Sequence, residues 1–129
     1  MATPSDMVAI ASDHAGFQLK DVLKAELAAL GHEVLDLGPD STESVDYPDF
    51  GEKMARAIRD GKVTLGVIVC GSGIGISIAA NRFAEVRAAL CHDGLTARLS
   101  RQHNNANVLA LGARVIGEDT AKEIGRAHV

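Results

Sequence analysis

Short apolar runs alternate with stretches of helical periodicity along the chain. The runs predict strands at Val8–Ser12, Glu33–Leu37, Leu65–Cys70, Arg87–Cys91 and Val108–Leu111. Between the runs, apolar residues recur every three or four positions, as in amphipathic helices. The first helix is followed by Gly31, a typical C-terminal cap, and its apolar positions are Leu19, Val22, Leu23, Leu27 and Leu30. Four further helices are predicted, from Pro48 to Gly61 and at Ile76–Phe83, Leu95–Gln102 and Glu118–Ala127.

The alternation of strand and helix predicts the fold class. Regular βα repetition without a linker, an internal repeat or a low-complexity segment is typical of one parallel sheet between two helical layers. We therefore expect residues 1–129 to form a single α/β domain, a three-layer α/β/α sandwich with a five-stranded parallel Rossmann-like sheet. Ligands bind such sheets beyond the carboxyl ends of the strands, so the polar residues that follow each strand are the candidates for a site.

Composition excludes several classes of function. The net charge is −4 and the basic residues are scattered, which argues against nucleic acid as a partner. The apolar runs are too short for a membrane span and residues 1–7 do not resemble a signal peptide, so we expect a cytoplasmic protein. Two cysteines without a paired CxxC predict neither a disulfide framework nor a zinc site.

Chemically capable side chains follow several of the predicted strands. Asp13 and His14 come after the first strand, Cys70 ends the third, and Arg114 comes after the fifth. His103 and Asn104 come after the helix that follows the fourth strand. We expect all of these groups at one edge of the sheet, and their coincidence indicates an enzyme site.

Each of these residues also has a purely structural interpretation. Asp13 could cap the first helix, and His103 and Asn104 could close theirs. Arg114 could be a surface charge. Tyr47, the only tyrosine, could pack beside Pro48, or its hydroxyl could reach a sugar. His32 and His128 lie far from the strand ends, and we interpret both as structural or exposed.

The loop Cys70-Gly71-Ser72-Gly73-Ile74-Gly75 is the most distinctive segment. It lacks the Gly-Lys-Ser/Thr of a P-loop, and its GxGxG spacing after the third strand is not the dinucleotide fingerprint. Its amides can bind an oxyanion at the start of a helix, and a helix start or a cation also favours a thiolate. A thiolate there suits either nucleophilic attack on an acyl or phosphoryl group, or removal of a proton next to a carbonyl.

Four segments, "SDHAGFQLK", "DYPDF", "CGSGIGISIAANRF" and "LSRQHNNANVLALGARV", together resemble the ribose-5-phosphate isomerase B family, which includes galactose-6-phosphate and allose-6-phosphate isomerases. The resemblance runs from about Val8 to Ile124. It implies an aldose–ketose isomerase that needs no metal or other cofactor and acts on a phosphorylated sugar. It also implies a homodimer, or a tetramer, with active sites at the subunit interface.

The resemblance further implies roles for individual residues. Cys70 matches the base that moves a proton between C1 and C2. One branch of the family uses a glutamate on the helix after the glycine loop in place of this cysteine. Because this chain has Ile76 at that place, it resembles the branch that uses the cysteine. Residues matched to stabilising the enediolate are Ser72 and the amides of Gly71, Gly73 and Gly75. Residues matched to hydroxyl protons and ring opening are Asp13 and His103. Residues matched to the phosphate are His14 and Arg114, and those matched to the sugar are Tyr47 and Asn104.

One feature of the family is missing. Its members usually continue into a "GGRHxxR"-like tail whose arginines hold phosphate, whereas this sequence ends at Arg126-Ala127-His128-Val129. Either the tail lies outside the sequence or phosphate is bound differently here.

The expected activity is interconversion of ribose 5-phosphate and ribulose 5-phosphate. The alternatives are the same reaction on allose or galactose 6-phosphate, a thiol hydrolase with Cys70 as nucleophile and His103 as base, and a non-catalytic module that binds a sugar phosphate or a nucleotide.

Overall fold

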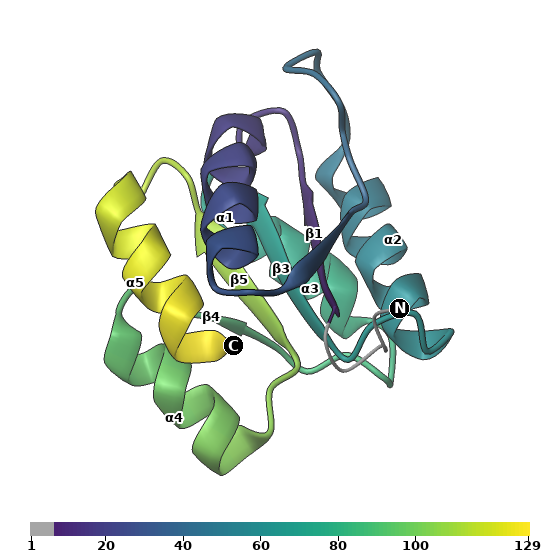
Figure 1. Ribbon diagram of the computed structural model, residues 1–129. Coiled ribbons are helices and arrows are strands. Elements are labelled where there is room, and N and C mark those ends of the chain that lie inside the picture. Colours follow the sequence, from purple (N-terminus) through teal and green to yellow (C-terminus); the bar gives the residue numbers. More distant parts are fainter. Residues whose placement is uncertain (1–6) are drawn as a thin grey trace.

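The computed structural model describes residues 7–129. Five parallel strands form one sheet at the centre of the molecule (Figure 1). The strands are β1 Met7–Ser12, β2 Glu33–Asp36, β3 Leu65–Cys70, β4 Ala88–Leu90 and β5 Val108–Gly112. Their order across the sheet is β2-β1-β3-β5-β4. β1 therefore pairs with both β2 and β3, in parallel.

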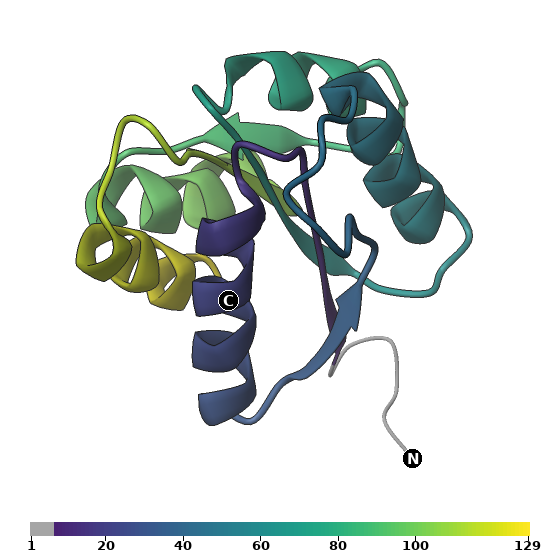
Figure 2. The same ribbon diagram turned by 90° about the horizontal axis from the view of Figure 1, so that it is seen from above.

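Helices cover both faces of the sheet (Figures 1 and 2). They are α1 Phe17–Ala29, α2 Tyr47–Arg59, α3 Ile74–Asn81, α4 Gly94–Asn104 and α5 Glu118–His128. Buried residues of α1, α4 and α5 pack in one apolar cluster with one face of the sheet, and buried residues of α2 and α3 pack in a second cluster on the other face. The predicted three-layer α/β/α sandwich is confirmed.

Strand β3 shows why its sequence is apolar without interruption. Val67 and Val69 belong to the cluster under α1 and α5, whereas Ile68 and Cys70 belong to the cluster under α2 and α3. Alternate side chains of a strand point to opposite faces, so a central strand with helices on both sides buries all of them. The sulfur of Cys70 therefore faces the α2–α3 layer.

Helix ends follow the local sequence signals. Gly31 follows α1 with φ +93°, and Gly61 follows α2 with φ +74°, a conformation that glycine adopts without steric cost. Pro48 lies in the first turn of α2, and the Asp93 carboxylate accepts a hydrogen bond from Thr96 N–H at the start of α4. The largest differences from prediction are β4, which is shorter than Arg87–Cys91, and α3, which begins at Ile74.

The register brings the carboxyl ends of three strands together. Ser12 of β1 lies beside Val69, and Cys70 of β3 lies beside Gly112 of β5. The loops that leave β1, β3 and β5 consequently begin next to one another at the carboxyl edge, which Figure 2 views from above. Within residues 7–129, none of the helices combines the length and apolar character that crossing a membrane requires.

Candidate active site

Cys70 lies at the carboxyl end of β3 with its side chain buried. Only 4% of the residue is exposed, and its Sγ accepts a hydrogen bond from the Gly73 N–H at 3.1 Å. The second thiol, Cys91, follows β4 and packs on the opposite face of the sheet, where burial raises its pKa. Of the two cysteines, only Cys70 lies on the glycine loop.

The glycine loop is closely packed, and two of its amides remain available. At Gly73 φ is +79°, and a Cβ there would lie 2.5 Å from Leu90 Cδ1, so no other residue fits without displacement. The Ile74 N–H bonds to Ser72 Oγ at 3.1 Å. Within the described part of the chain, the N–H groups of Gly71 and Gly75 have no acceptor. Gly75 lies in the first turn of α3, where a helix attracts negative charge, and Gly71 lies just before the N-cap residue Gly73.

Backbone hydrogen bonds join the neighbouring loops to this one. Asp13 N–H donates to the Val69 carbonyl at 3.1 Å, and Arg114 N–H donates to the Gly71 carbonyl at 2.9 Å. The Arg114 guanidinium lies beside Gly71, 3.5 Å from the point where a Cβ would stand. Asp13 Oδ1 also accepts from the Gly16 N–H at 2.9 Å, in the turn before α1, whose N-cap residue is Gly16. The structure thus brings Asp13, Cys70 and Arg114 to one edge.

The loop between β2 and α2 also lies at the carboxyl edge of the sheet and projects beyond it (Figure 1). His14 Nδ1 lies 3.1 Å from both the N–H and the carbonyl oxygen of Val45. The ring of Tyr47 lies against Gly75, where a Cβ would come within 2.6 Å of two ring carbons. Sequence patterns give no signal for Val45, because its contact with His14 is made by the backbone and not by the side chain.

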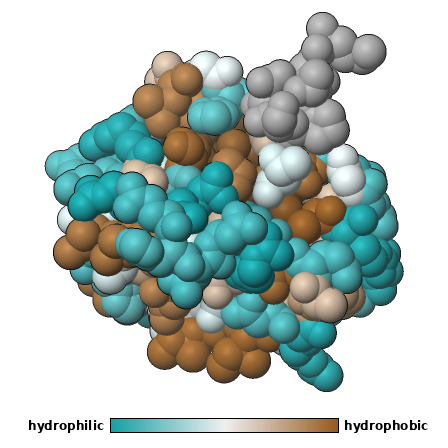
Figure 3. Space-filling model, turned by 90° about the horizontal axis from the view of Figure 1, so that it is seen from below, coloured by the Kyte–Doolittle hydropathy of each residue, from teal (hydrophilic) through white to brown (hydrophobic). Residues whose placement is uncertain are grey.

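His103 and Asn104 do not lie at this edge, so the prediction of one shared edge is wrong for them. They end α4, which starts near the carboxyl end of β4 and runs back along the sheet. Asn105 O accepts from Arg87 Nε, just before β4, and β5 begins at Val108. Both residues therefore lie at the amino edge, the face of mixed hydrophilic and hydrophobic residues seen in Figure 3. Their assigned roles stay predictions.

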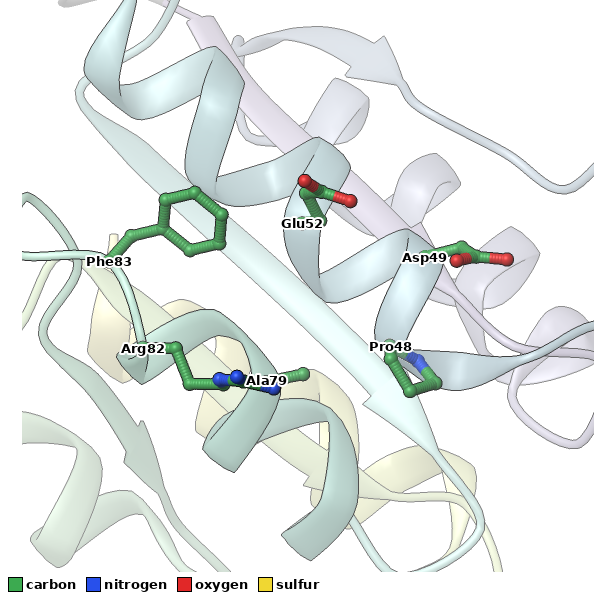
Figure 4. A pocket seen from close by; sticks show the side chains of 6 residues that line it. All are labelled: Pro48, Asp49, Glu52, Ala79, Arg82 and Phe83. Atoms are coloured by element: carbon green, nitrogen blue, oxygen red, sulfur yellow. The ribbon is translucent and has the colours of Figure 1, made fainter.

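Two surface hollows lie outside the glycine loop. One of about 400 Å³ lies between α2 and α3, lined by Pro48, Asp49, Glu52, Ala79, Arg82 and Phe83 (Figure 4). Another of about 530 Å³ lies at the amino edge and is lined in part by Arg87, Arg101 and Asn107. Neither contains a predicted site residue. Among residues 7–129, no three His, Cys, Asp or Glu side chains gather as they would around a metal ion.

Comparison with known proteins agrees with this architecture. Residues 8–129 match the family described as Ribose/Galactose Isomerase. Ribose-5-phosphate isomerase B of Escherichia coli K12 is 49% identical over 117 residues, which cover 91% of this chain and 78% of that protein. D-erythrulose-4-phosphate isomerase of Pectobacterium atrosepticum is 47% identical over 118 residues, which cover 91% of this chain and 78% of that protein.

A solved structure shows the same fold. Ribose-5-phosphate isomerase B from Clostridium thermocellum superposes with a TM-score of 0.93 at 48% identity, and the match covers 95% of this chain and 82% of that one. The chain therefore belongs to the ribose/galactose isomerase family.

Proposed function

We propose that the chain interconverts ribose 5-phosphate and ribulose 5-phosphate through a cis-enediolate, with Cys70 as the base. The observation that carries the proposal is the buried thiol at the start of a loop whose Gly71 and Gly75 amides have no acceptor in the described structure. A base and oxyanion donors at one point are what proton transfer next to a carbonyl requires. Family membership and the ribose-5-phosphate isomerase relatives support this choice of reaction.

The steps follow from these groups. The Cys70 thiolate removes the proton from C2 of the open-chain aldose, and the electron pair moves into the C1–C2 bond and onto O1. The loop amides and Ser72 stabilise the negative oxygen. A proton then moves from O2 to O1, assisted by Asp13, and the thiol returns its proton to C1 to give the ketose. Each oxyanion donor of this kind contributes about 3–4 kcal/mol to transition-state stabilisation.

The remaining residues bind substrate in this proposal. Arg114 and His14 face the phosphate, and Tyr47 and Asn104 contact the sugar. His103 assists ring opening. Because His103 and Asn104 lie at the amino edge, they can serve this site only from a second copy of the chain.

A homodimer supplies that second copy. Large apolar side chains are exposed on the two helices next to edge strand β4, namely Ile74 and Ile78 on α3 and Leu95 and Leu99 on α4. The two residues of each pair are four positions apart and therefore adjoin on their helix, and exposed apolar groups of this kind are typical of interfaces. The exposed apolar residues therefore support an assembly in which each site is shared between two chains.

A shorter substrate is the second candidate. The D-erythrulose-4-phosphate isomerase relative is nearly as similar as the ribose-5-phosphate isomerase relative. The four-carbon and five-carbon reactions share one proton transfer and differ in the distance from C1 to the phosphate. The same holds for allose and galactose 6-phosphate, so the position of the phosphate contacts decides among them.

The proposal is tested by the Cys70→Ala variant, with Cys91→Ala as the matched control. With ribose 5-phosphate in deuterated water, NMR should show that the wild type and Cys91→Ala form ribulose 5-phosphate and incorporate deuterium. Cys70→Ala should fold and lose at least about 10³-fold in kcat. Near-normal turnover of Cys70→Ala would refute the mechanism, and a covalent intermediate with burst kinetics would favour the thiol hydrolase.

A panel of four-, five- and six-carbon aldose phosphates settles the substrate. We expect the highest kcat/KM with ribose 5-phosphate. A higher value with the four-carbon substrate would reassign the substrate and leave the chemistry intact, whereas binding without turnover of any member would indicate a non-catalytic module.

A further inference from the structure

Lys20 is a buried cation in the first half of α1. Its side chain is 1% exposed, and its ammonium donates to Asp36 Oδ1 at 2.8 Å, to Asp36 Oδ2 at 3.0 Å and to the Pro39 carbonyl at 2.7 Å. Lysine is almost never fully buried unless it is paired. The three contacts place all three ammonium protons on acceptors.

The acceptors of Lys20 belong to the start of the β2–α2 loop. Asp36 is the last residue of β2, and its Oδ1 also accepts from the Gly38 N–H at 2.8 Å. The Gly38 carbonyl in turn accepts from the Ser12 N–H at 3.1 Å, at the end of β1. Burial alone would raise the pKa of Asp36, but hydrogen bonds from Lys20 and its neighbours hold it below its usual value. The start of the loop is therefore fixed against α1 and β1.

The other end of the same loop carries the candidate substrate contacts. Val45 meets the His14 ring through its backbone, and Tyr47 lies against Gly75 of the glycine loop. Residues 40–44 between these two ends are exposed. Residues 40–44 form only a short connection, so anchoring the start of the loop at Asp36 and Pro39 restricts where Val45 and the start of α2 at Tyr47 can lie.

We propose that Lys20 is a positioning residue that holds the β2–α2 loop so that Val45 stays against His14 and Tyr47 stays against Gly75 of the glycine loop. The Lys20 ammonium bonds to Asp36 and Pro39, neither of which is a candidate site residue, so Lys20 acts through the loop. The kinetic part of this inference rests on the proposed isomerase function. The structural part stands independently of it.

The chain contains a suitable reporter for the structural part. Tyr47 is the only tyrosine and the sequence has no tryptophan, so intrinsic fluorescence reports on the end of this loop. A residue that serves stability alone would lower the melting temperature when replaced and leave the folded-state environment of Tyr47 unchanged. A positioning residue would change that environment in the folded protein.

Lys24 provides the matched control. It donates to the same carboxylate, to Asp36 Oδ2 at 3.1 Å, but its side chain is 46% exposed, and the hydrogen bond to the Pro39 carbonyl comes from Lys20 instead. Exposed ion pairs contribute little. Lys20→Met and Lys24→Met therefore each remove one cation from Asp36, and only the first removes the link to the loop.

In the fluorescence experiment, acrylamide quenching is measured without substrate at a temperature where each variant is folded. Tyr47 is already 42% exposed in the folded protein. We expect the quenching constant of Lys20→Met to rise measurably, because a released loop frees the ring from Gly75, and that of Lys24→Met to stay at the wild-type value. If Lys20→Met does not fold, Lys20→Arg, which keeps the charge but not the geometry of the three contacts, should give a smaller increase. Unchanged quenching in the folded Lys20 variant would overturn the inference.

In the kinetic experiment, the substrate is ribose 5-phosphate. We expect Lys20→Met, or Lys20→Arg in its place, to raise KM by about tenfold while kcat changes little, since Cys70 and the glycine loop leave β3 and do not depend on this loop. Increased quenching with an unchanged KM would overturn the positioning role. An inactive wild type would contradict the proposed function, while the quenching result would still decide the anchoring of the loop.

Discussion

Gly73 shows how a single residue sets the geometry of the candidate site. Its positive φ turns the chain from β3 into α3, and its N–H meets the Cys70 sulfur. The space that a side chain would need is filled by Leu90 and by the backbone of Leu111. The glycine is thus required by the turn, by the packing and by the contact to the thiol.

Gly73→Ala should lower the free energy of unfolding by about 3 kcal/mol, because a left-handed conformation costs about 1–2 kcal/mol and a forced contact costs at least as much again. Gly31→Ala is the control. Its φ is also positive, but a Cβ there meets nothing within 4 Å, so its loss should stay near 1 kcal/mol. Urea unfolding measures both values, and equal losses would contradict the packing argument.

At the scale of elements, α2 and α3 pack so closely that the helix interface holds a glycine. A Cβ on Gly51 would lie 2.9 Å from Ala79 Cβ and 3.1 Å from the Ile76 carbonyl. This contact sets the spacing between the helix that begins at Tyr47 and the helix that follows the glycine loop. The spacing of two helices thereby affects how the tyrosine ring meets Gly75.

Two glycine-to-alanine changes in helices should have opposite effects. Gly125 in α5 has only Leu23 Cδ2 near its missing Cβ, at 3.8 Å, so Gly125→Ala should raise stability by up to about 1 kcal/mol. Gly51→Ala gains the same helix propensity but must push α3 away, and we expect a net loss of about 1–2 kcal/mol. Thermal and urea unfolding give the two signs, and a stabilised Gly51→Ala would show that the interface yields.

Sequence patterns predicted the elements well but placed His103 and Asn104 at the wrong edge of the sheet. Leu65–Cys70 was bounded correctly because a buried strand is apolar throughout, and Gly31 and Gly61 fixed helix ends. His103 was expected at the carboxyl edge, where residues that directly follow a parallel strand lie. His103 ends a helix instead, and that helix runs back to the amino edge. His103 lies shortly before Val108 in the sequence, and because β5 begins at Val108, this indicates the amino edge of the sheet.

Other features could not be predicted from local patterns. The contact of His14 with Val45 depends on the path of a loop through space, as does the contact of Tyr47 with Gly75. Lys20 falls in register with Leu23 and Leu27, so its burial was readable from the helical period. Its acceptors on β2 were not, because they depend on how α1 docks beside that strand.

At the scale of the whole molecule, a buried histidine couples folding to pH. His128 is 1% exposed, and neither ring nitrogen has a hydrogen-bond partner within residues 7–129. Burial, with the nearby charge of Arg101, lowers its pKa from 6.5 to about 4. The unfolded chain therefore binds a proton between about pH 6.5 and 4 that the folded chain does not, and stability falls as the pH falls through this window.

Between pH 7 and pH 5 the free energy of unfolding should fall by about 2 kcal/mol because of His128. The pKa of Asp36 is lowered instead, so its stabilising contribution is lost only below about pH 4 and does not interfere. Urea unfolding at the two pH values should show the loss in the wild type and a clearly smaller loss in His128→Leu. Equal losses in both proteins would remove His128 as the cause.

The proposed sharing of the site predicts complementation between two inactive variants. Cys70→Ala and His103→Ala should each be nearly inactive. A mixture of equal amounts, after exchange of subunits, should regain about a quarter of the wild-type activity, because half of the dimers are mixed and one of their two sites is intact. Activity assays before and after exchange measure this, and no recovery in confirmed mixed dimers would place both residues' roles within one chain.

The placement of His103 and Cys70 at opposite edges also restricts how copies can assemble. Each chain then has one edge that supplies His103 to another copy and one edge that needs His103 from another copy. When copies stack in the same direction, two such edges on one molecule can generate an open filament. A two-fold axis that sets the strands of the two sheets in opposite directions satisfies both edges of both chains at once. Under the proposed sharing, this antiparallel arrangement ends growth at two copies and leaves no unsatisfied edge to recruit a third.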